Sequence, residues 1–533
     1  MYNNVTLVCI NSKYIHQSLG IYYLKAYSNR DDIKIYESNI NLDTDKIVND
    51  ILKDSPDLIG FSCYIFNIEK TLEVCEKIKR KSNAKIFFGG PEASFEYESL
   101  FDYCDQIIVG AGESAFVSLL NGNTDKVIYG TRIDNPLERS PYTDEYFCNA
   151  KGKIAYFEAS RGCPYACTYC MSSNDKLQLF DINLVKQELL KFKDKGIKIL
   201  KFVDRTFNAK AEYCNEILSF LIDNFTDSDL TFHFEVAPDI FKQSTLDIIK
   251  RARLGLFQFE AGIQTFNDEV LSNIRRKSNV IKAVENINTL LSFQNCHVHS
   301  DLIIGLTGED ESSLRNSFNT LYRLWTNQMQ VGILKVLKGS RLKIEQSDGY
   351  VFSQKPPYEI ISTPTMDEKV IMCGKKIAYL VDKYYNTNRF HFTLRYLEKK
   401  YEPWETFTYL AKVVDYKAGV FELYEKLFEY AVKIGEDELL VNELLKFDYL
   451  ISNKSKNLPP IIKREFSKEF KKIAKTEQKD GEFCYYFSIN PITLEKGEYV
   501  AYFNYNKQNY ITELYEYRIL DYTLLKENYE RSG

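Results

Sequence analysis

Three cysteines are gathered in one short stretch of the chain. The segment ASRGCPYACTYCMSS places Cys163, Cys167 and Cys170 in a Cys-x-x-x-Cys-x-x-Cys pattern, directly after an expected strand, KIAYFEA. A structural zinc site usually takes four protein ligands in paired units, and no fourth cysteine follows here at a regular spacing. Three cysteines on an iron–sulfur cluster leave one iron free to coordinate another molecule. The pattern therefore predicts an iron–sulfur centre with one open iron.

The residues around the cysteines indicate an exposed turn and not a core strand. Gly162 opens the loop and Pro164 follows the first cysteine, and both residue types are typical of rigid turns. The alternative is that the three thiols are core residues that happen to lie close together in the sequence. The turn residues favour the metal-binding interpretation.

The bulk composition indicates a globular protein of more than one domain. The chain has 533 residues, of which 44 % are apolar and 27 % charged, and we expect three domains. It contains no run of eighteen apolar residues and no leader-like N-terminus, and its twelve cysteines are otherwise scattered. These features predict a cytoplasmic protein with no membrane segment. A net charge of −5 offers no general attraction for nucleic acid.

Residues 1–135 alternate short apolar strands with helical periods. The expected strands are NVTLVCI, IKIYES, LIGFSCY, AKIFFGG and QIIVGAGE. This alternation predicts a doubly wound parallel sheet of the Rossmann-like type. Ligands of such sheets lie beyond the carboxyl ends of the strands, where the loops NSKYIHQS, SCYIFN, GGPEASFEYE and GAGES are found.

The alternation resumes over residues 136–348 with about six strands, each followed by a helix or loop, which predicts a complete or partial (β/α) barrel. Residues 349–533 carry long amphipathic patterns and a short strand-like pair, CYYFSIN and GEYVAYFNYN, so we expect a mostly helical third domain. The segment 453–480 is rich in basic side chains, and a solvated amphipathic helix is a better interpretation of it than an RNA contact.

The cysteine pattern, with Tyr169 directly before the last cysteine, resembles the radical SAM superfamily. The resemblance implies a partial (β/α)6 barrel and a 4Fe-4S cluster whose open iron binds S-adenosylmethionine, which one electron then cleaves to a 5'-deoxyadenosyl radical. The segment FVDRTFN stands where the family often has Gly-Gly-Glu, and SDLIIGLTGE resembles the family's Gly-x-Ile-x-Gly-x-x-Glu segment. For each carboxylate the alternative is a salt bridge or helix cap in the barrel rim. The residues expected to contact S-adenosylmethionine are Tyr169, Asp204, Glu235, Glu260, Gln264 and Asp301.

The first domain resembles the cobalamin-binding domain of the cobalamin-dependent branch of this superfamily. The fingerprint Asp-x-His-x-x-Gly, Ser-x-Leu and Gly-Gly keeps its spacing here while some letters change: Tyr14 stands for the aspartate and Leu19 for the first glycine. A flavodoxin-like domain without cofactor is the alternative, and His16 is either a cobalt ligand or a polar residue over the ring. The residues expected at cobalamin are Tyr14, His16, Ser62, Tyr64, Gly89, Gly90, Pro91, Gly110, Gly112 and Glu113.

The two resemblances together imply an enzyme that uses both cofactors. Methylation of an unactivated carbon of a small-molecule or peptide substrate is the expected reaction, with an electron donor such as flavodoxin or ferredoxin and an anaerobic setting. Three alternatives stay open: a non-methylating radical rearrangement or cyclisation, a methylthiotransferase or tRNA-modifying enzyme, and a non-catalytic zinc-binding protein. The role of the C-terminal region, which resembles an uncharacterised extension seen in some members, stays open as well.

Overall fold

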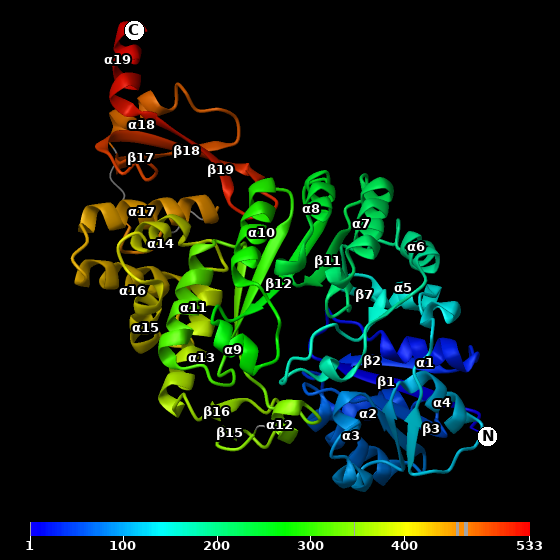
Figure 1. Cartoon of the computed structure of the whole chain (residues 1–533). Coiled ribbons are helices and arrows are strands. Elements are labelled where there is room, and N and C mark those ends of the chain that lie inside the picture. Colours follow the sequence, from blue (N-terminus) through cyan, green and yellow to red (C-terminus); the bar gives the residue numbers. More distant parts are fainter. Residues whose placement is uncertain (1, 346, 455–457, 463–466, 533) are drawn as a thin grey trace.

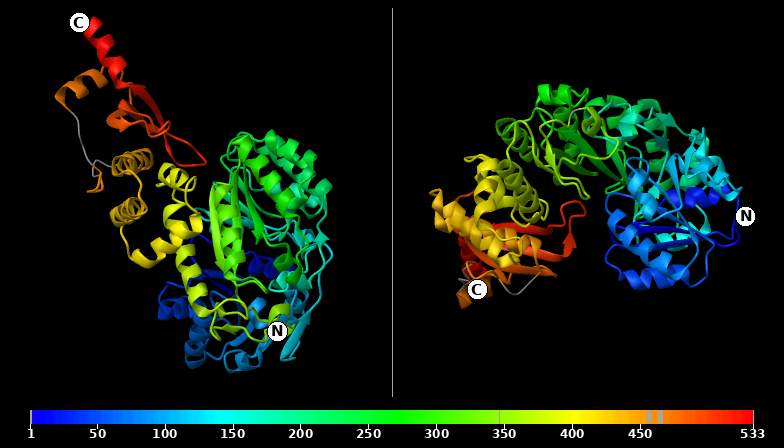
Figure 2. Two further views of the ribbon diagram at one scale, coloured as in Figure 1. Left: turned by 60° about the vertical axis from the view of Figure 1, so that its left-hand side comes forward. Right: turned by 90° about the horizontal axis from the view of Figure 1, so that it is seen from below.

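The computed structural model describes residues 2–345, 347–454, 458–462 and 467–532. Three regions follow one another in an arc, with the N-terminal domain at one end, a barrel in the middle and the C-terminal region at the other end (Figures 1 and 2). The predicted fold class is confirmed in all three regions. The basic segment 453–480 includes residues 455–457 and 463–466, which lie outside the described residues.

The N-terminal domain is a parallel sheet of six strands in the order β2-β1-β3-β4-β5-β6. Strands β1 and β3 are buried along almost their whole length, as expected for a parallel sheet covered by helices on both faces. The strands are β1 Val5–Asn11, β2 Lys34–Asn39, β3 Leu58–Ser62, β4 Lys85–Gly89, β5 Gln106–Gly110 and β6 Val127–Gly130, and the helices are α1 Gly20–Ser28, α2 Thr44–Leu52, α3 Ile68–Lys81 and α4 Gly112–Leu120.

The middle domain is a second parallel sheet, in the order β14-β13-β12-β11-β10-β7, with helices on its outer face (Figure 1). Strands β7 and β14 are the two edges of this sheet, so the barrel is partial. Its strands are β7 Ala155–Phe157, β10 Ile199–Phe202, β11 Thr231–Val236, β12 Phe257–Gln264, β13 His297–Ile304 and β14 Gln328–Ile333, and its helices are α5 Asp144–Ala150, α6 Ile182–Leu190, α7 Ala211–Phe225, α8 Gln243–Lys250, α9 Asp268–Asn273, α10 Val280–Phe293 and α11 Glu311–Arg323.

The inner face of the barrel is polar. Strand β12 reads FQFEAGIQ, and its residues at 257, 259, 261 and 263 are buried whereas those between them are partly exposed. Strand β11, which reads TFHFEV, alternates in the same way. Because the apolar side chains pack under the outer helices, the Gln, His and Glu side chains face the barrel interior. The interior is therefore open to polar ligands and is not filled by the branched apolar layers of a closed barrel.

The C-terminal region joins a helical bundle to a small antiparallel sheet. The expected strand pair is present as β17 and β18, and a third strand, β19, which was not predicted, completes the sheet. The elements are α12 Arg341–Glu345, β15 Val351–Phe352, β16 Ile360–Ser362, α13 Glu368–Tyr384, α14 His391–Leu397, α15 Pro403–Val413, α16 Val420–Lys433, α17 Glu438–Ser452, α18 Lys468–Ala474, β17 Glu482–Ile489, β18 Lys496–Gln508, β19 Tyr515–Asp521 and α19 Tyr522–Ser532.

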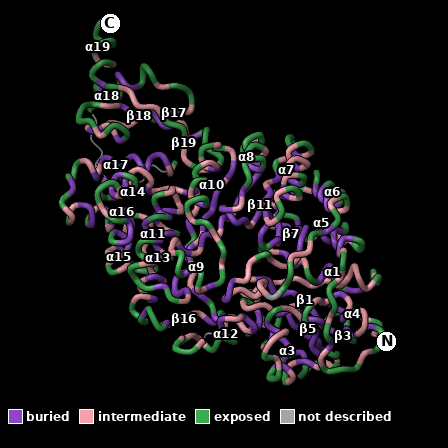
Figure 3. The backbone as a smooth tube through the Cα atoms, viewed as in Figure 1, coloured by how far each residue is buried: buried purple, intermediate pink, exposed green. Residues whose placement is uncertain are grey.

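One apolar core runs through all three regions. It includes Phe116 of the N-terminal domain, Phe157 and Phe259 of the barrel, and Tyr384 of the helical bundle. Buried residues are concentrated in the strands and on the inner sides of the helices (Figure 3). Because this core continues from one region to the next, it does not mark where one domain ends, and the domain limits at 135 and 348 stay predictions. None of the helices in the described part of the chain combines the length and apolar character needed to cross a bilayer.

Candidate active site

The three cysteines lie in a loop that is closed by a short antiparallel ladder. Strand β8, Ser160–Arg161, pairs with β9, Gln178–Leu179, so the intervening residues form one hairpin loop after β7. Gly162 opens this loop with φ of +80°, and a Cβ atom there would lie 2.3 Å from the carbonyl oxygen of Lys176. Only glycine fits this position without moving the backbone. The turn chemistry predicted for the loop is therefore required by its geometry.

The thiols of this loop are close enough to influence one another. Burial raises the pKa of the Cys167 thiol, Arg276 opposes this shift, and the nearby Cys170 and Cys163 thiols add to it. Among the described residues, the three sulfur atoms are not all within 4.8 Å of one another. Four thiolates around one zinc ion would be about 3.8 Å apart, given Zn–S bonds of about 2.3 Å. The three sulfur atoms thus do not form a compact zinc-like group, and the iron–sulfur cluster at these cysteines stays a prediction.

Arg276 is a residue of this site that the sequence analysis missed. Its Nη1 lies 3.8 Å from Cys167 Sγ, and its Nη2 donates to the carbonyl oxygen of Gly262 at 2.7 Å. The guanidinium also lies over the ring of Tyr165, 4.7 Å from its centroid. Arg276 follows α9 in the sequence RRKS, which carries no motif signal. Only the fold brings this cation to the cysteine loop.

Asp204 fastens the start of the cysteine loop. Its carboxylate is buried and accepts hydrogen bonds from the Ala159 amide at 3.0 Å and the Ser160 hydroxyl at 2.5 Å. Burial raises the pKa of Asp204 to about 7. Both oxygens are thus engaged next to Arg161 and Gly162. The expected contact of Asp204 with S-adenosylmethionine stays a prediction, and the structure gives the residue a second role in holding the loop.

The remaining residues expected at S-adenosylmethionine come from the loop and two neighbouring strands. Tyr169 is packed against the core beside Cys167. Gln264 ends β12 with φ of +76°, a conformation that is costly for a residue other than glycine and that is often found at functional sites. Its side-chain amide lies over Gly262, close to Arg276. Gln264 therefore stands beside the cysteine loop.

Glu235, Glu260 and Asp301 lie together on the inner face of the barrel. Glu235 is the register partner of Glu260 on the neighbouring strand. Lys201 lies between the two carboxylates, with Nζ 3.5 Å from Glu235 Oε1 and 2.9 Å from Glu260 Oε2. Burial raises the pKa of Glu235 and of Asp301. The tertiary structure thus brings together three carboxylates that are distant in the sequence.

His16, predicted at the cobalamin edge, is joined to the barrel. Its Nδ1 lies 2.7 Å from the hydroxyl of Tyr156 on β7, and the backbone at His16 forms a parallel bridge with Ile154. Burial and the nearby Lys13 and Lys201 lower the pKa of His16. One ring nitrogen of His16 is therefore already paired with a barrel residue.

The glycine loops of the first domain lie at the carboxyl ends of β4 and β5. Gly90 has φ of +100°, and a Cβ atom there would lie 2.7 Å from the carbonyl oxygen of Cys63, so the fold itself requires this glycine. Pro91 begins a short 3-10 turn after it. At Gly89 an added Cβ would lie 3.9 Å from the Cβ of Ile108, which is an ordinary van der Waals contact. Gly110 ends β5 and has a positive φ as well.

Glu113 and Arg161 link the first domain to the cysteine loop. Arg161 Nη2 lies 2.7 Å from Glu113 Oε1, at the start of α4, and 3.0 Å from Glu158 Oε2. The guanidinium also lies over the ring of Tyr23 in α1, at 5.1 Å. Arg161 directly precedes Gly162 and Cys163. The Glu113 side chain, which was expected at cobalamin, thus pairs with Arg161 at the start of the cysteine loop. Gly112, directly before Glu113, is the first residue of α4.

Exposed aromatic side chains gather at the same edge of the first sheet, where Ser62 ends β3. Tyr64 and Phe66 are stacked, with ring centroids 5.3 Å apart and planes at 6°, and Phe66 is 42 % exposed. Tyr14 in the β1–α1 loop is 68 % exposed. Single exposed aromatic side chains are normal on protein surfaces, so their exposure alone does not indicate a ligand. These rings lie in the loops that follow β1 and β3, and the expected contacts of Tyr14 and Tyr64 with cobalamin stay predictions.

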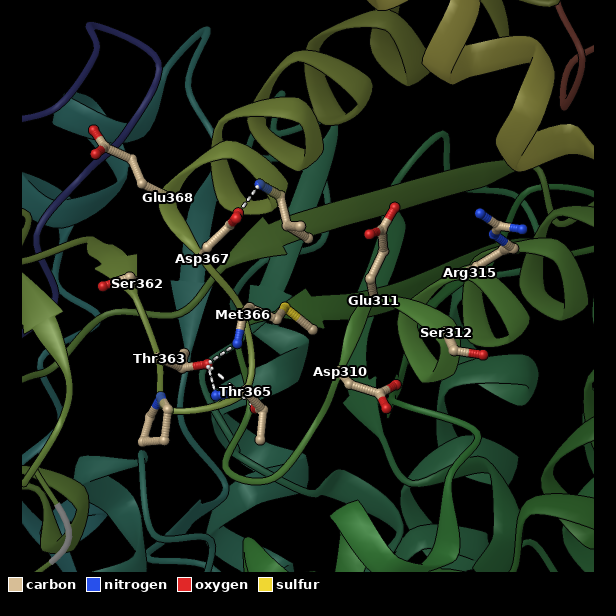
Figure 4. A pocket seen from close by; sticks show the side chains of 12 residues that line it. Asp310, Glu311, Ser312, Arg315, Ser362, Thr363, Thr365, Met366, Asp367 and Glu368 are labelled. Carbon is tan, nitrogen blue, oxygen red and sulfur yellow. Dashed lines mark hydrogen bonds between the residues drawn. The ribbon is translucent and has the colours of Figure 1, made fainter.

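A separate hollow of about 870 Å³ lies between the N-termini of α11 and α13 (Figure 4). Asp310 and Asp367 line it, and each caps its own helix by accepting from the backbone amides of Ser313 and Val370. Glu309 ends the segment SDLIIGLTGE, directly before Asp310. Its side chain is buried and accepts a hydrogen bond from the Thr265 hydroxyl, and burial raises its pKa to about 8. The hollow contains none of the predicted site residues, and its acids serve the helices.

Comparison with known families matches three separate stretches of the chain. Residues 5–120 match the B12 binding domain, residues 157–321 match the radical SAM superfamily, and residues 347–519 match a family described as a protein of unknown function, DUF4080. The fold and the cysteine loop define the class as radical SAM. The chain thus combines a B12-binding domain with a radical SAM domain, and its C-terminal region matches the uncharacterised family.

Several curated proteins are similar to part of the chain. It is 23 % identical over 314 residues to 2-(S-pantetheinyl)-carbapenam-3-carboxylate methyltransferase of Streptantibioticus cattleyicolor, covering 50 % of this chain and 45 % of that protein. It is 25 % identical over 342 residues to the cobalamin-dependent radical SAM methyltransferase TokK of Streptomyces tokunonensis, covering 55 % and 49 %. The chain thus spans about half the length of these relatives.

Solved structures show the same fold. The cobalamin-dependent S-adenosylmethionine radical enzyme OxsB superposes with a TM-score of 0.56 at 14 % identity, covering 85 % of this chain and 73 % of that one. The radical S-adenosylmethionine methyltransferase TsrM of Kitasatospora setae gives 0.53 at 15 % identity, covering 66 % and 80 %. At this identity the likeness concerns the architecture alone.

Proposed function

We propose that this protein is a cobalamin-dependent radical SAM enzyme that methylates an unactivated carbon of a small-molecule substrate. The observation that carries the proposal is the ion pair between Arg161 and Glu113, at 2.7 Å, which fixes the cluster loop against the ligand edge of the B12-binding domain. A substrate bound in the polar barrel interior would lie close to both centres. The curated relatives named as methyltransferases favour methyl transfer over other uses of cobalamin.

When bound, the cluster with S-adenosylmethionine supplies radical chemistry, and cobalamin supplies a methyl group. The residues of the chain position these groups. Cys163, Cys167 and Cys170 would hold the cluster, and Asp204 fixes the backbone from which the first of them extends. Arg276 places a positive charge beside Cys167. The exposed rings of the first domain would lie against the corrin.

The barrel wall contributes substrate contacts. Lys201, His233, Glu235 and Glu260 form a connected network on its inner face, and such groups bind polar substrates by hydrogen bonds and charge. We therefore propose a polar substrate for this chain. The electron needed to start the reaction would come from a reduced flavodoxin or ferredoxin in an anaerobic cytoplasm.

The test is anaerobic reconstitution with iron, sulfide, cobalamin, a reductant and S-adenosylmethionine, followed by measurement of 5'-deoxyadenosine and S-adenosylhomocysteine. We expect both products, and we expect neither in Cys163→Ala, which lacks one cluster ligand. Formation of 5'-deoxyadenosine without S-adenosylhomocysteine would indicate a non-methylating radical reaction. Purified protein that contains zinc in place of iron and cobalt would contradict the proposal.

A further inference from the structure

Three potential metal ligands meet on the inner face of the barrel. Glu260 on β12 and His299 on β13 are direct register partners, and Asp301 follows two residues later on the same face of β13. One ligand atom from each residue lies within 4.8 Å of the others. Neighbouring strands place same-face side chains about 5 Å apart, so three such residues can converge on one point.

Two of these ligand atoms lack hydrogen-bond partners. His299 is only 6 % exposed, and its Nε2 and the Oδ1 of Asp301 are buried atoms without a hydrogen bond in the part of the chain that the structure describes. The two atoms are 3.0 Å apart, which is ion-pair distance when the imidazole is protonated. Buried polar atoms in native proteins are almost always satisfied. A cation between them would satisfy both.

The surroundings orient the third ligand. Glu260 Oε2 is 2.9 Å from Lys201 Nζ and 3.0 Å from His233 Nε2, which leaves Oε1 without these partners. Outer contacts of this kind fix a carboxylate ligand in place. Lys201 also contacts Glu235, which in turn lies 4.0 Å from Arg205. Glu235, Glu260 and Asp301 thus share this wall with the cationic side chains of Lys201 and Arg205.

We propose that Glu260, His299 and Asp301 bind a divalent first-row metal ion that is separate from the iron–sulfur cluster and from cobalt. One imidazole nitrogen and two carboxylate oxygens suit Mn²⁺, Fe²⁺ or Zn²⁺, and they do not suit the soft ions that prefer thiolates. Three protein ligands leave coordination positions open toward the barrel interior. These positions would take an oxygen donor of the substrate, such as a carboxylate or hydroxyl group. This role differs from the contact with S-adenosylmethionine expected of Glu260 and Asp301.

The probe is Mn²⁺ alone, added to the full-length protein purified without iron, cobalamin or S-adenosylmethionine. Free Mn²⁺ gives a six-line electron paramagnetic resonance signal that disappears on binding, and thiolates compete poorly for this ion. We expect one binding site in the natural protein. Asp301→Asn and His299→Gln should weaken binding at least about tenfold, which is the scale seen when a metal site loses supporting groups.

Glu235→Gln is the matched control, because Glu235 faces the same interior and contacts Lys201 but is not one of the three ligands. It should retain Mn²⁺ binding. Circular dichroism identifies any variant that fails to fold, and Glu260→Gln then takes its place. The absence of a site in the natural protein, or equal binding by all variants, would overturn the proposal. Because the assay needs neither cluster nor turnover, its failure would leave the proposed methyl transfer untouched.

Discussion

Arg276 and Cys167 are in direct contact, with Nη1 of the guanidinium 3.8 Å from Sγ of the thiol. The arginine comes from the segment after α9, and the cysteine comes from the loop after β7. A positive charge beside a cluster ligand stabilises the more negative, reduced state of the cluster. The contact therefore links a residue with no sequence signal to the redox behaviour of the centre.

Replacement of Arg276 should make the cluster harder to reduce. In reconstituted protein, Arg276→Ala should lower the midpoint potential by on the order of tens of millivolts, where about 59 mV equals a tenfold change for one electron. A redox titration followed by electron paramagnetic resonance measures this value. Arg275→Ala is the control, since Arg275 pairs with Glu345 in an exposed ion pair. Equal potentials in both variants would contradict the assigned role.

Loss of Arg161 should destabilise the protein strongly. Its side chain is 17 % exposed and pairs with Glu113, which is 5 % exposed, and with Glu158. Removing one partner of a buried pair costs about 3–5 kcal/mol because the other charge stays buried. Arg161→Met should therefore lower the free energy of unfolding in urea by this amount. Glu113→Gln should cost less, since Arg161 keeps Glu158.

The matched control for Arg161 is Arg323, which forms an exposed pair with Glu402, with side chains 43 % and 48 % exposed. Arg323→Met should cost less than about 1 kcal/mol, as expected for a surface ion pair. Similar losses in Arg161→Met and Arg323→Met would show that the interdomain pair is not important for stability.

Asp204 should make stability depend on pH. Burial raises the pKa of Asp204 to about 7, well above the usual range of an aspartate, so the folded state keeps a proton that the unfolded chain releases. The protonated Asp204 adds its full contribution to the free energy of unfolding below about pH 4. As the pH rises to about 7 this contribution is lost, so the free energy of unfolding falls by at most about 4 kcal/mol. Asp204→Asn should flatten this decrease, measured as the free energy of unfolding in urea at several pH values.

Asp448 gives a comparison for the Asp204 variant. It is also fully buried with a raised pKa of about 7, but it accepts from the amides of Phe392 and Thr393 in the C-terminal bundle. Asp448→Asn should remove a similar part of the pH dependence without affecting the cluster content. An unchanged pH profile in both variants would mean that neither carboxyl is protonated in the folded state.

His16 should not be the axial ligand of cobalt, because Tyr14 stands where the fingerprint has the aspartate that orients the histidine, and the imidazole is paired instead with Tyr156 of the barrel, at 2.7 Å from Nδ1. Cob(II)alamin bound to the protein should show no nitrogen superhyperfine splitting in its electron paramagnetic resonance spectrum, and His16→Ala should leave the spectrum unchanged. Tyr156→Phe releases the imidazole and serves as the second variant. A splitting that disappears only in His16→Ala would establish ligation.

The sequence predicted the elements of the fold better than it predicted the site. The strand–helix alternation gave both parallel sheets, because buried parallel strands are short apolar runs between helical periods. The short pair in the C-terminal region was predicted as well, whereas β19, with the mixed sequence YEYRILD and partial exposure, was not. A strand at the edge of a small sheet carries a weak apolar pattern, so periodicity alone does not indicate it.

The sequence by itself determined the cysteine loop, since Cys163, Cys167 and Cys170 are close in the chain and Gly162 fixes their turn. The partners of that loop were decided only by the tertiary structure. Arg276, Glu113 and Asp204 come from other strands and helices, and each carries a charge that could equally be solvated on the surface. The same holds for His299 and Asp301, whose proposed role depends on Glu260 lying beside them on the adjacent strand β12. The spacing of metal ligands within one loop is set by residues that are neighbours in the sequence. The pairing of charged side chains on different strands depends instead on strand order and register, which the sequence pattern does not encode residue by residue.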